Sequence, residues 1–314
     1  MATFVTPRAH LISNAKSGAG KGSTLTQECK QICEELNYEL VEYTIHCPEE
    51  LEEQSRIAVE RALNSGDIVI AAGGDGTIRS VAQAAYGKNV RFAVIPCGTF
   101  NFFARTHNIP EDYLAAFRLA LTGLPRPVRL GLVNGQVFLI NASLGLYAKA
   151  IKDRERNTNR FGRHRLVVII STIISFFSKH RLLKVDLLCE DKLDTVYTPM
   201  IFIGNNALQL GNLALSVAHC MKANLLAVVM MKPITKYEIF RIILRGIFKT
   251  LEDEKNVNSF CVDSLTIYTR MPSHMVALDG EILSMNSPLH INSLPGSLNM
   301  VLPTHAPLII EPLK

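Results

Sequence analysis

Hydrophobic and polar positions along the first 125 residues form short apolar runs separated by helical patterns. Runs that are apolar on both faces and end at turn residues are typical of strands in a sheet covered by helices on both sides. Three transitions from strand through turn to helix predict an α/β sheet with nucleotide-sized crevices at its strand carboxyl ends. The expected strands are 10–13, 39–45, 68–72 and 91–95, and the expected helices are 23–36, 48–63, 77–86 and 112–121.

The pattern changes after the segment GLPRP at 123–127, where strands follow strands. Asn134-Gly135 lies between the runs 128–133 and 136–142 and is a strong signal for a two-residue hairpin turn. We therefore expect an α/β domain at 1–126, a mostly antiparallel β domain at 127–303 and a tail at 304–314. Further strands are expected at 184–189, 195–203, 225–230, 264–269, 275–278, 289–292 and 297–301.

Composition adds limits to this picture. The length of 314 residues suits two domains, and the longest uncharged apolar stretch, 166–177, is too short to span a bilayer. The N-terminus lacks the apolar core of a signal peptide, so we expect a cytoplasmic protein. Seven scattered cysteines without a CxxC pair or Cys/His cluster indicate neither a disulfide framework nor a zinc site.

Two expected helices combine apolar and basic residues. The segment 160–184 has an apolar centre between basic flanks that include Arg160 and Lys184, and 237–249 carries basic residues at four-residue spacing. Such helices suit peripheral contact with an anionic membrane surface. An ordinary core helix with solvated ends is the alternative, and it is favoured for either helix alone. Nucleic-acid binding is not expected, because the basic residues are not interleaved with exposed aromatics.

The segment 67–80, DIVIAAGGDGTIRS, predicts a phosphate site. Gly73, Gly74 and Gly76 allow a sharp turn whose amides face an anion, and we expect Thr77 to cap the following helix. Asp75 suggests a nucleotide with a divalent metal, or a base for a hydroxyl acceptor. The alternative is a tight turn in which Asp75 only accepts nearby amides.

Three other segments carry candidate chemistry. The glycine-rich stretch 14–22 has P-loop residue types without the P-loop spacing, and a flexible connector is its alternative. In PCGTFNFFAR at 96–105, Thr99 is placed to cap a helix. Asp279 and Glu281 flank Gly280 after an apolar strand. The two carboxylates can converge on one site, or Asp279-Gly280 can form a plain β-turn.

These residues together resemble the diacylglycerol kinase catalytic-domain family, which includes sphingosine and ceramide kinases and bacterial soluble lipid kinases. The resemblance covers nearly the whole chain, although GGDGT alone is shared with NAD kinases and phosphofructokinases. The matching residues stand in the family's order: Asn14 with Ser17-Gly18, Gly73 to Thr77, Pro96 with Gly98, Thr99 and Asn101, and Asp279-Gly280-Glu281.

The resemblance implies an N-terminal α/β nucleotide-binding domain of the NAD-kinase and diacylglycerol-kinase type, followed by an antiparallel β-sandwich domain, with the substrate between them. It implies an ATP- and Mg²⁺-dependent lipid kinase that phosphorylates a hydroxyl of diacylglycerol or a sphingoid-type lipid. Asp75, Asp279 and Glu281 match catalytic positions, with Asp75 at the metal and Glu281 as first choice for accepting the proton. The nucleotide-binding matches are Asn14, Ala15, Lys16, Ser17, Gly18, Thr44, Gly73, Gly74, Gly76, Thr77, Ser80 and Thr99.

The chain also departs from the family. Phe102, Arg129 and Lys222 stand where family members carry metal-supporting acidic residues. These departures leave open a catalytically weak lipid-binding or regulatory module. A kinase of a soluble acceptor such as NAD also stays open, because it would share GGDGT. The sequence leaves the oligomeric state open, a homodimer included.

Overall fold

The computed structural model describes residues 6–14, 22–145, 148, 182–212, 216–233 and 257–304. The chain divides into two compact units. Unit 1 is Met1–Leu130 with Leu294–Ile309, and unit 2 is Gly131–Ser293 with Ile310–Lys314. Strand β16 (Leu289–Leu302) contributes to both units. Its residues from Leu294 onward belong to unit 1, although the sequence placed the strand 297–301 in the β domain. The domain boundaries expected from the sequence stay a prediction.

Unit 1 is built on parallel strands in the order β2-β1-β3-β4. The end of β16 lies parallel to β4, where Met300 pairs with Phe92. The elements of the unit are β1 (Arg8–Asn14), α1 (Gly22–Glu35), β2 (Glu39–Ile45), α2 (Pro48–Ser65), β3 (Ile68–Gly73), α3 (Asp75–Ala85), β4 (Arg91–Pro96), α4 (Phe102–Thr106), α5 (Tyr113–Thr122) and the greater part of β5 (Leu124–Val133).

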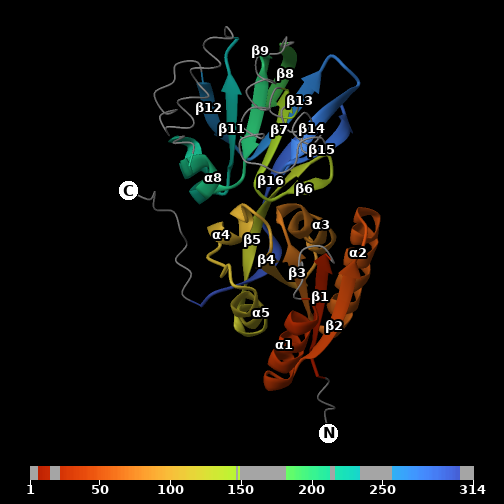
Figure 1. Ribbon diagram of the computed structural model, residues 1–314. Coiled ribbons are helices and arrows are strands. Elements are labelled where there is room, and N and C mark those ends of the chain that lie inside the picture. Colours follow the sequence, from red (N-terminus) through yellow and green to blue (C-terminus); the bar gives the residue numbers. More distant parts are fainter. Residues whose placement is uncertain are drawn as a thin grey trace. The chain divides into compact units, whose positions relative to one another are not determined.

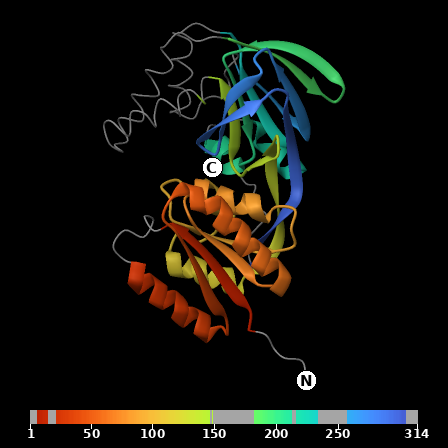
Figure 2. The ribbon, with the colours of Figure 1, turned by 90° about the vertical axis from the view of Figure 1, so that its right-hand side faces the viewer.

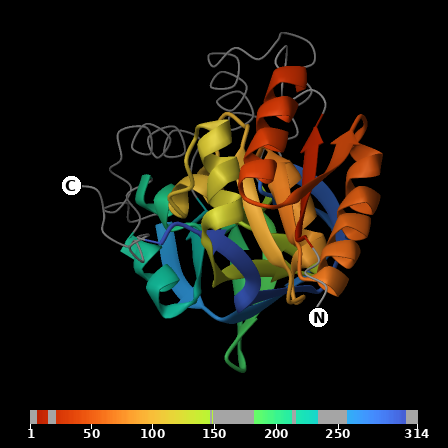
Figure 3. The same cartoon turned by 90° about the horizontal axis from the view of Figure 1, so that it is seen from below.

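Helices cover both faces of this sheet. Helices α2 and α3 contact each other on one face (Figure 2), and α1 and α5 contact each other on the opposite face (Figure 3). Strand β3 is buried along its whole length, as a parallel strand between two helical layers should be. The predicted α/β class is confirmed for this unit.

Local sequence signals set several helix ends. Helix α2 begins at Pro48 with Glu49 and Glu50 in its first turn, and it ends at Gly66 in the left-handed conformation (φ 74°). Proline at a helix start, acidic residues beside it and glycine after the end are all favourable. The Asp112 side chain caps α5 by accepting the Ala115 N–H. These signals explain why the expected ends lie within two residues of those in the structure.

Unit 2 contains two sheets of antiparallel strands (Figure 1). One has the order β16-β13-β8-β9 with the β5–β6 hairpin beside β16, and the other has the order β12-β11-β10-β7-β14-β15. The elements are β6 (Gln136–Phe138), β7 (Asn141–Gly145), β8 (Leu183–Cys189), β9 (Lys192–Thr198), β10 (Met200–Gly204), α8 (Ala207–Asn212), the 3₁₀ helix η1 (Ser216–Ala223), β11 (Leu226–Met231), β12 (Val257–Val262), β13 (Ser264–Thr269), β14 (Ser273–Leu278) and β15 (Glu281–Asn286).

The core of unit 2 joins both sheets. Val185 and Ile267 of the first sheet share one buried cluster with Leu144, Ile201 and Val276 of the second. Alternate residues of each strand point to this cluster, because successive side chains of a strand face opposite sides. One sheet thus combines the parallel strands β2-β1-β3-β4 with the antiparallel strands β16-β13-β8-β9. The other is a separate antiparallel sheet in the C-terminal region, which agrees with the predicted fold class.

Several expected strands of unit 2 have different limits. The run 195–203 breaks at Pro199 into β9 and β10, which belong to different sheets, because proline lacks the N–H that a continuous ladder needs. The run 136–142 divides into β6 and β7. The two runs 289–292 and 297–301 form one continuous β16. Strands β12 and β15 were not expected.

The cysteine expectation was wrong in one respect. Cys220 of η1 and Cys261 of β12 form a disulfide across 41 residues of sequence, whereas Cys29, Cys33, Cys47, Cys97 and Cys189 are free.

Within the described parts of the chain, no helix combines the length and apolar character needed to cross a membrane. The expected basic helices fall outside the described residues, apart from 182–184 of the first.

A buried polar cluster lies near the starts of β1 and β3. Asp67 Oδ1 accepts the Arg8 backbone N–H at 2.9 Å, and His10 Nε2 lies 3.2 Å from Asp67 Oδ2. His10 Nδ1 lies 3.0 Å from the Tyr43 hydroxyl, to which Arg61 also donates. His10 is 1% exposed, and burial, opposed by the hydrogen bond to Asp67, lowers its pKa.

This cluster predicts a pH-dependent stability. Because the folded state lowers the pKa of His10, it binds fewer protons than the unfolded chain, and stability should fall as pH drops below the ordinary histidine value of about 6.5. One proton gives a slope of up to about 1.4 kcal/mol per pH unit. Urea unfolding at pH 7 and pH 5 should show a smaller loss for His10→Gln than for the wild type.

His107 and His274 also have lowered pKa values. The wild type and His10→Gln both contain these histidines, so their effect cancels when the losses of stability of the two proteins are compared. Equal losses of stability in the two proteins between pH 7 and pH 5 would contradict the role of His10.

Candidate functional site

The candidate nucleotide residues of unit 1 lie at the carboxyl ends of its parallel strands. Ser13 pairs with Thr44 on one side and with Ala72 on the other. Asn14 therefore ends β1 beside Thr44 and the last residues of β3, and Gly73 pairs with Pro96 at the end of β4. Ligands of open α/β sheets bind at this edge.

The turn after β3 differs from the expectation in one detail. Helix α3 starts at Asp75 with extended Gly74 as its N-cap, so Thr77 lies in the first turn and does not cap the helix. A Cβ at Gly73 would lie 2.5 Å from the Thr77 Cβ, so Thr77 packs directly over glycine. The Ser80 hydroxyl donates to the Gly76 carbonyl at 3.2 Å.

The turn after β4 is held by Asn101. Its Oδ1 accepts the Gly98 N–H at 2.9 Å, and its Nδ2 donates to the Gly98 carbonyl at 3.0 Å. Asn101 is the N-cap residue of α4 in the left-handed conformation (φ 49°), which asparagine tolerates. Thr99 is exposed in the turn and does not cap α4, contrary to expectation.

The two turns touch through their backbones. The Cys97 N–H donates to the Gly73 carbonyl at 2.9 Å. A Cβ at Gly98 would lie only 2.8 Å from the Gly74 Cα. Because backbone atoms cannot swing aside like a flexible side chain, the position of Gly98 requires glycine.

The Asp75 carboxylate joins the same two turns. Its Oδ1 accepts the Phe103 N–H at 3.4 Å, and the backbone N–H groups of Phe102 and Asn101 also favour its charged form. Burial outweighs these donors and raises the pKa of Asp75. The carboxylate thus anchors the start of α4, and a cation near it would restore the charge that burial disfavours.

Two residues that depart from the family pattern also lie in unit 1. Burial lowers the pKa of Arg129 in β5 to about 10. Burial, followed by the charge of Arg129, lowers the pKa of His107 to about 4. The Phe102 ring stacks on exposed Phe100, with 5.7 Å between ring centroids. The third departure, Lys222, is exposed in η1 of unit 2.

The acidic pair of unit 2 has two different environments. Asp279-Gly280 is the two-residue turn between β14 and β15, with φ values of 50° and 94°, and Leu278 pairs with Glu281 across it. Asp279 Oδ2 accepts the Leu139 N–H at 2.7 Å. The N–H groups of Ile140 and Asn141 donate to its Oδ1 at 2.8 and 2.9 Å. Asp279 therefore holds the backbone between β6 and β7, whereas Glu281 is exposed.

Strand β7 places buried oxygens beside this turn. Ala142 pairs with Leu278, and Ser143 pairs with Ala277. Ala142 belongs to the core between the sheets, so Asn141 and Ser143 face the opposite side of their sheet. Among the described residues, Asn141 Oδ1 and Ser143 Oγ have no hydrogen-bond partner. Such atoms point to a bound polar group or water.

The structure therefore brings Asn14, Thr44 and the glycine turn of unit 1 to one sheet edge, whereas Asp279 and Glu281 belong to unit 2. Ala15, Lys16, Ser17 and Gly18 lie outside the described residues. Residue-pattern reasoning missed the buried oxygens of Asn141 and Ser143. The alternation in NASLG, polar on one face and apolar on the other, was the available signal.

Comparison with known proteins shows what the N-terminal part of the chain is similar to. Residues 8–133 match the family model of the diacylglycerol kinase catalytic domain. Over these residues the chain is similar to that family. The predicted resemblance is thereby confirmed for these residues.

Relatives agree with this assignment. A Bacillus subtilis protein named diacylglycerol kinase is 38% identical over 135 residues, which are 42% of this chain and 44% of that protein. A Pseudomonas aeruginosa protein named probable lipid kinase YegS-like is 45% identical over 98 residues, 30% of this chain and 32% of that protein. These matches span less than half of either relative. A Yersinia pestis protein of the same name is 29% identical over 267 residues, 81% of this chain and 85% of that protein.

Solved structures share the fold across both units. The structure of a diacylglycerol kinase from Bacillus anthracis has a TM-score of 0.72 at 20% identity, covering 96% of this chain and 99% of that chain. A second structure from the same organism has a TM-score of 0.74 at 18% identity and covers 98% of both chains. The likeness in fold to these structures therefore extends over both units of the chain.

The contact between the two glycine turns can be tested by Gly98→Ala. The added Cβ would meet the Gly74 backbone, so we expect a loss of about 1–3 kcal/mol in the free energy of unfolding, typical of overpacking. Gly211→Ala in α8 is the matched control, because a Cβ there meets nothing within 4 Å. It should leave stability within about 1 kcal/mol of the wild type. Urea unfolding measures both, and a neutral Gly98→Ala would contradict the contact.

The two members of the acidic pair should differ in stability. Asparagine tolerates the left-handed conformation as aspartate does, so Asp279→Asn removes only the carboxylate that accepts three N–H groups. We expect it to cost about 2–4 kcal/mol, since buried donors lose a charged acceptor. Exposed Glu281→Gln should change stability by less than about 0.5 kcal/mol. Equal unfolding midpoints for the two variants would show that the Asp279 hydrogen bonds do not stabilise the fold.

Proposed function

We propose that the protein is an ATP-dependent lipid kinase that transfers the γ-phosphate to a lipid hydroxyl, of diacylglycerol or a sphingoid-type lipid. The observation that carries the proposal is the glycine turn after β3, which packs on the turn after β4 and opens directly into α3 beside Asp75. The family of residues 8–133 and the names of the relatives support it.

On the nucleotide side, the amides of Gly74, Asp75 and Gly76 at the start of α3 are the groups that would receive phosphate oxygens. Asn14, Thr44 and Thr99 stand at the same strand ends and would contact the rest of the nucleotide, together with the proposed segment 15–18. The half-buried Asp75 carboxylate fits Mg²⁺, which prefers oxygen ligands and usually keeps waters and substrate phosphates around one or two carboxylates. Mg²⁺ would neutralise charge on the transferred phosphate.

On the acceptor side, Glu281 is the proposed acceptor of the hydroxyl proton. Its carboxylate is exposed beside the turn, whereas three N–H groups engage the carboxylate of Asp279. Asp279 thus acts as a positioning residue. Asn141 Oδ1 and Ser143 Oγ, buried on the neighbouring strand, would accept or exchange hydrogen bonds with the polar part of the acceptor. A lipid acceptor would bring the protein to a membrane surface.

A catalytically weak lipid-binding module is the second candidate. The half-buried cation Arg129 and the aromatic Phe102 stand where acidic residues support metal in the family. This candidate requires nucleotide or lipid binding without phosphate transfer.

Labelled ATP with magnesium separates these functions. The protein is incubated with mixed micelles that contain diacylglycerol, sphingosine or ceramide, and with NAD as a soluble acceptor. We expect label in one lipid product. Label in NAD alone would contradict the lipid assignment. ATP binding without any labelled product would favour the module.

Two variants test the residue roles in the same assay. Asp75→Asn and Glu281→Gln should each lower kcat by about 100-fold or more, because one removes charge at the phosphates and the other removes the proton acceptor. Asp191→Asn is the matched control, since Asp191 is an exposed acidic residue in another hairpin turn, with φ 63°. It should keep wild-type turnover. Unchanged kcat in both test variants would show that the assigned residues do not perform the transfer.

A further inference from the structure

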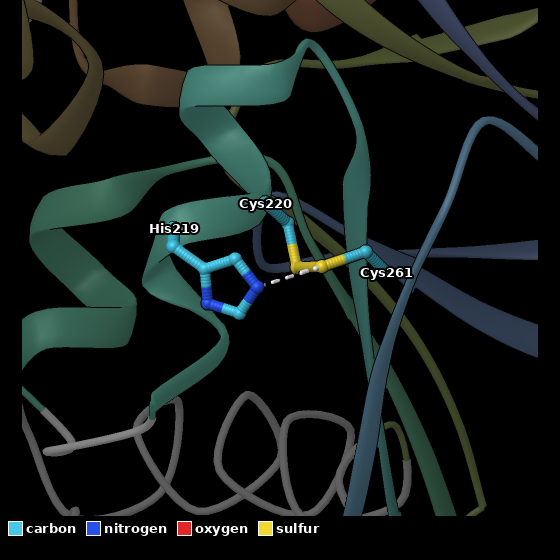
Figure 4. Close-up of a disulfide and its surroundings, with 3 residues drawn as sticks. All are labelled: His219, Cys220 and Cys261. Atoms are coloured by element: carbon cyan, nitrogen blue, oxygen red, sulfur yellow. Dashed lines mark hydrogen bonds between the residues drawn. A yellow bond between two sulfur atoms is a disulfide. The ribbon is translucent and has the colours of Figure 1, made fainter.

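Unit 2 contains a cluster of two cysteines and one histidine that the proposed kinase site does not use. His219 and Cys220 are neighbours in η1, and Cys261 lies in β12 (Figure 4). Their ligand atoms all lie within 4.8 Å of one another. The cysteine sulfurs form a disulfide, and His219 Nε2 points at the Cys261 Sγ from 3.4 Å.

The geometry of the imidazole suits a shared metal. Zinc binds sulfur at about 2.3 Å and imidazole nitrogen at about 2.0–2.1 Å in tetrahedral sites, which separates the two ligand atoms by about 3.6 Å. The observed distance of 3.4 Å between His219 Nε2 and Cys261 Sγ is close to this value.

The three side chains of the cluster differ in their exposure. Cys220 is buried, Cys261 is half-buried and His219 is exposed. Strand β12 pairs with β11, where Cys261 stands opposite Ala227, and β11 follows η1 directly in sequence. The sheet thus fixes one thiol and the short 3₁₀ helix carries the other two ligands. A metal would link the same two elements as the disulfide does.

We propose that the reduced form of this cluster is a binding site for a thiophilic divalent cation of the zinc class, with Cys220 Sγ, Cys261 Sγ and His219 Nε2 as ligands. A dithiol reductant delivers two electrons and two protons to the disulfide and becomes a disulfide itself, which leaves two cysteine thiols. The cation then replaces the two thiol protons, which pass to solvent. The His219 ring binds through the lone pair of Nε2, with its proton on Nδ1.

The ligand chemistry selects the cation. Thiolates and imidazole suit zinc, whereas Mg²⁺ and Ca²⁺ prefer oxygen ligands. Three protein ligands leave one tetrahedral position for water or another group. Oxidation would form the disulfide and release the cation, so the site is open only in the reduced protein. This proposal does not depend on the kinase function.

Cobalt(II) is the probe, because tetrahedral thiolate coordination gives it distinct visible and charge-transfer absorption. The full chain is reduced with a phosphine, freed of reductant without air and titrated with Co²⁺ alone, then with Zn²⁺. We expect one Co²⁺ per chain bound with thiolate charge-transfer bands, displacement of this Co²⁺ by Zn²⁺, and no thiolate bands when the oxidised protein is titrated.

Variants locate the site. Cys261→Ser and His219→Gln should each weaken Co²⁺ binding at least tenfold, and Cys189→Ser, which changes a free half-buried cysteine elsewhere in unit 2, should bind as the wild type does. Circular dichroism of each variant checks that it is folded. The absence of thiolate bands in the reduced wild type, or equal affinity in all four proteins, would overturn the proposal.

Discussion

Backbone contact between the turns after β3 and β4 is the constraint on which the candidate nucleotide site depends. A Cβ at Gly98 would lie 2.8 Å from the Gly74 Cα, so no side chain can separate the turns. The Cys97 N–H and the Asp75 carboxylate tie them together from either side of this contact. Because α3 begins at Asp75, the same contact fixes where the first amides of that helix point. The geometry of the proposed phosphate site is thus set by backbone packing.

The Asp75 carboxylate has one structural role and one proposed chemical role. Its carboxylate accepts N–H groups at the start of α4 and is also the proposed metal ligand, although burial raises its pKa. The two roles are compatible, because the N–H donors orient the carboxylate and a nearby cation favours its charged form. The aromatic pair Phe100 and Phe102 and the cation Arg129 lie in the same unit. If these residues replace acidic residues of the family, as the sequence predicts, more of the proposed metal binding in unit 1 rests on Asp75.

The sequence predicted what local chemistry controls. The α/β class, the buried strand at 68–72, the cap at Asp112 and the hairpin at Asn134-Gly135 follow from patterns a few residues long. Contacts between distant residues left no periodic signal: Asp75 and Phe103 are 28 positions apart, Asp279 and Ile140 are 139 apart, and the disulfide joins residues 41 apart. The predictions that Thr77 and Thr99 cap helices were wrong for the same reason. Each glycine turn takes its shape from the other turn, and short sequence windows contain only one of them.

The acidic turn of unit 2 shows how one short segment can serve both structure and chemistry. Asp279-Gly280 forms a local hairpin turn, and the plain β-turn that the sequence left open as an alternative is present. Yet this turn also aims the Asp279 carboxylate at three N–H groups between β6 and β7, which fixes β7 beside it. Since those donors engage Asp279, the proposed proton acceptor is Glu281, one glycine further on. The turn thereby separates a positioning carboxylate from an exposed one, and two carboxylates so close in sequence need not converge on the same task.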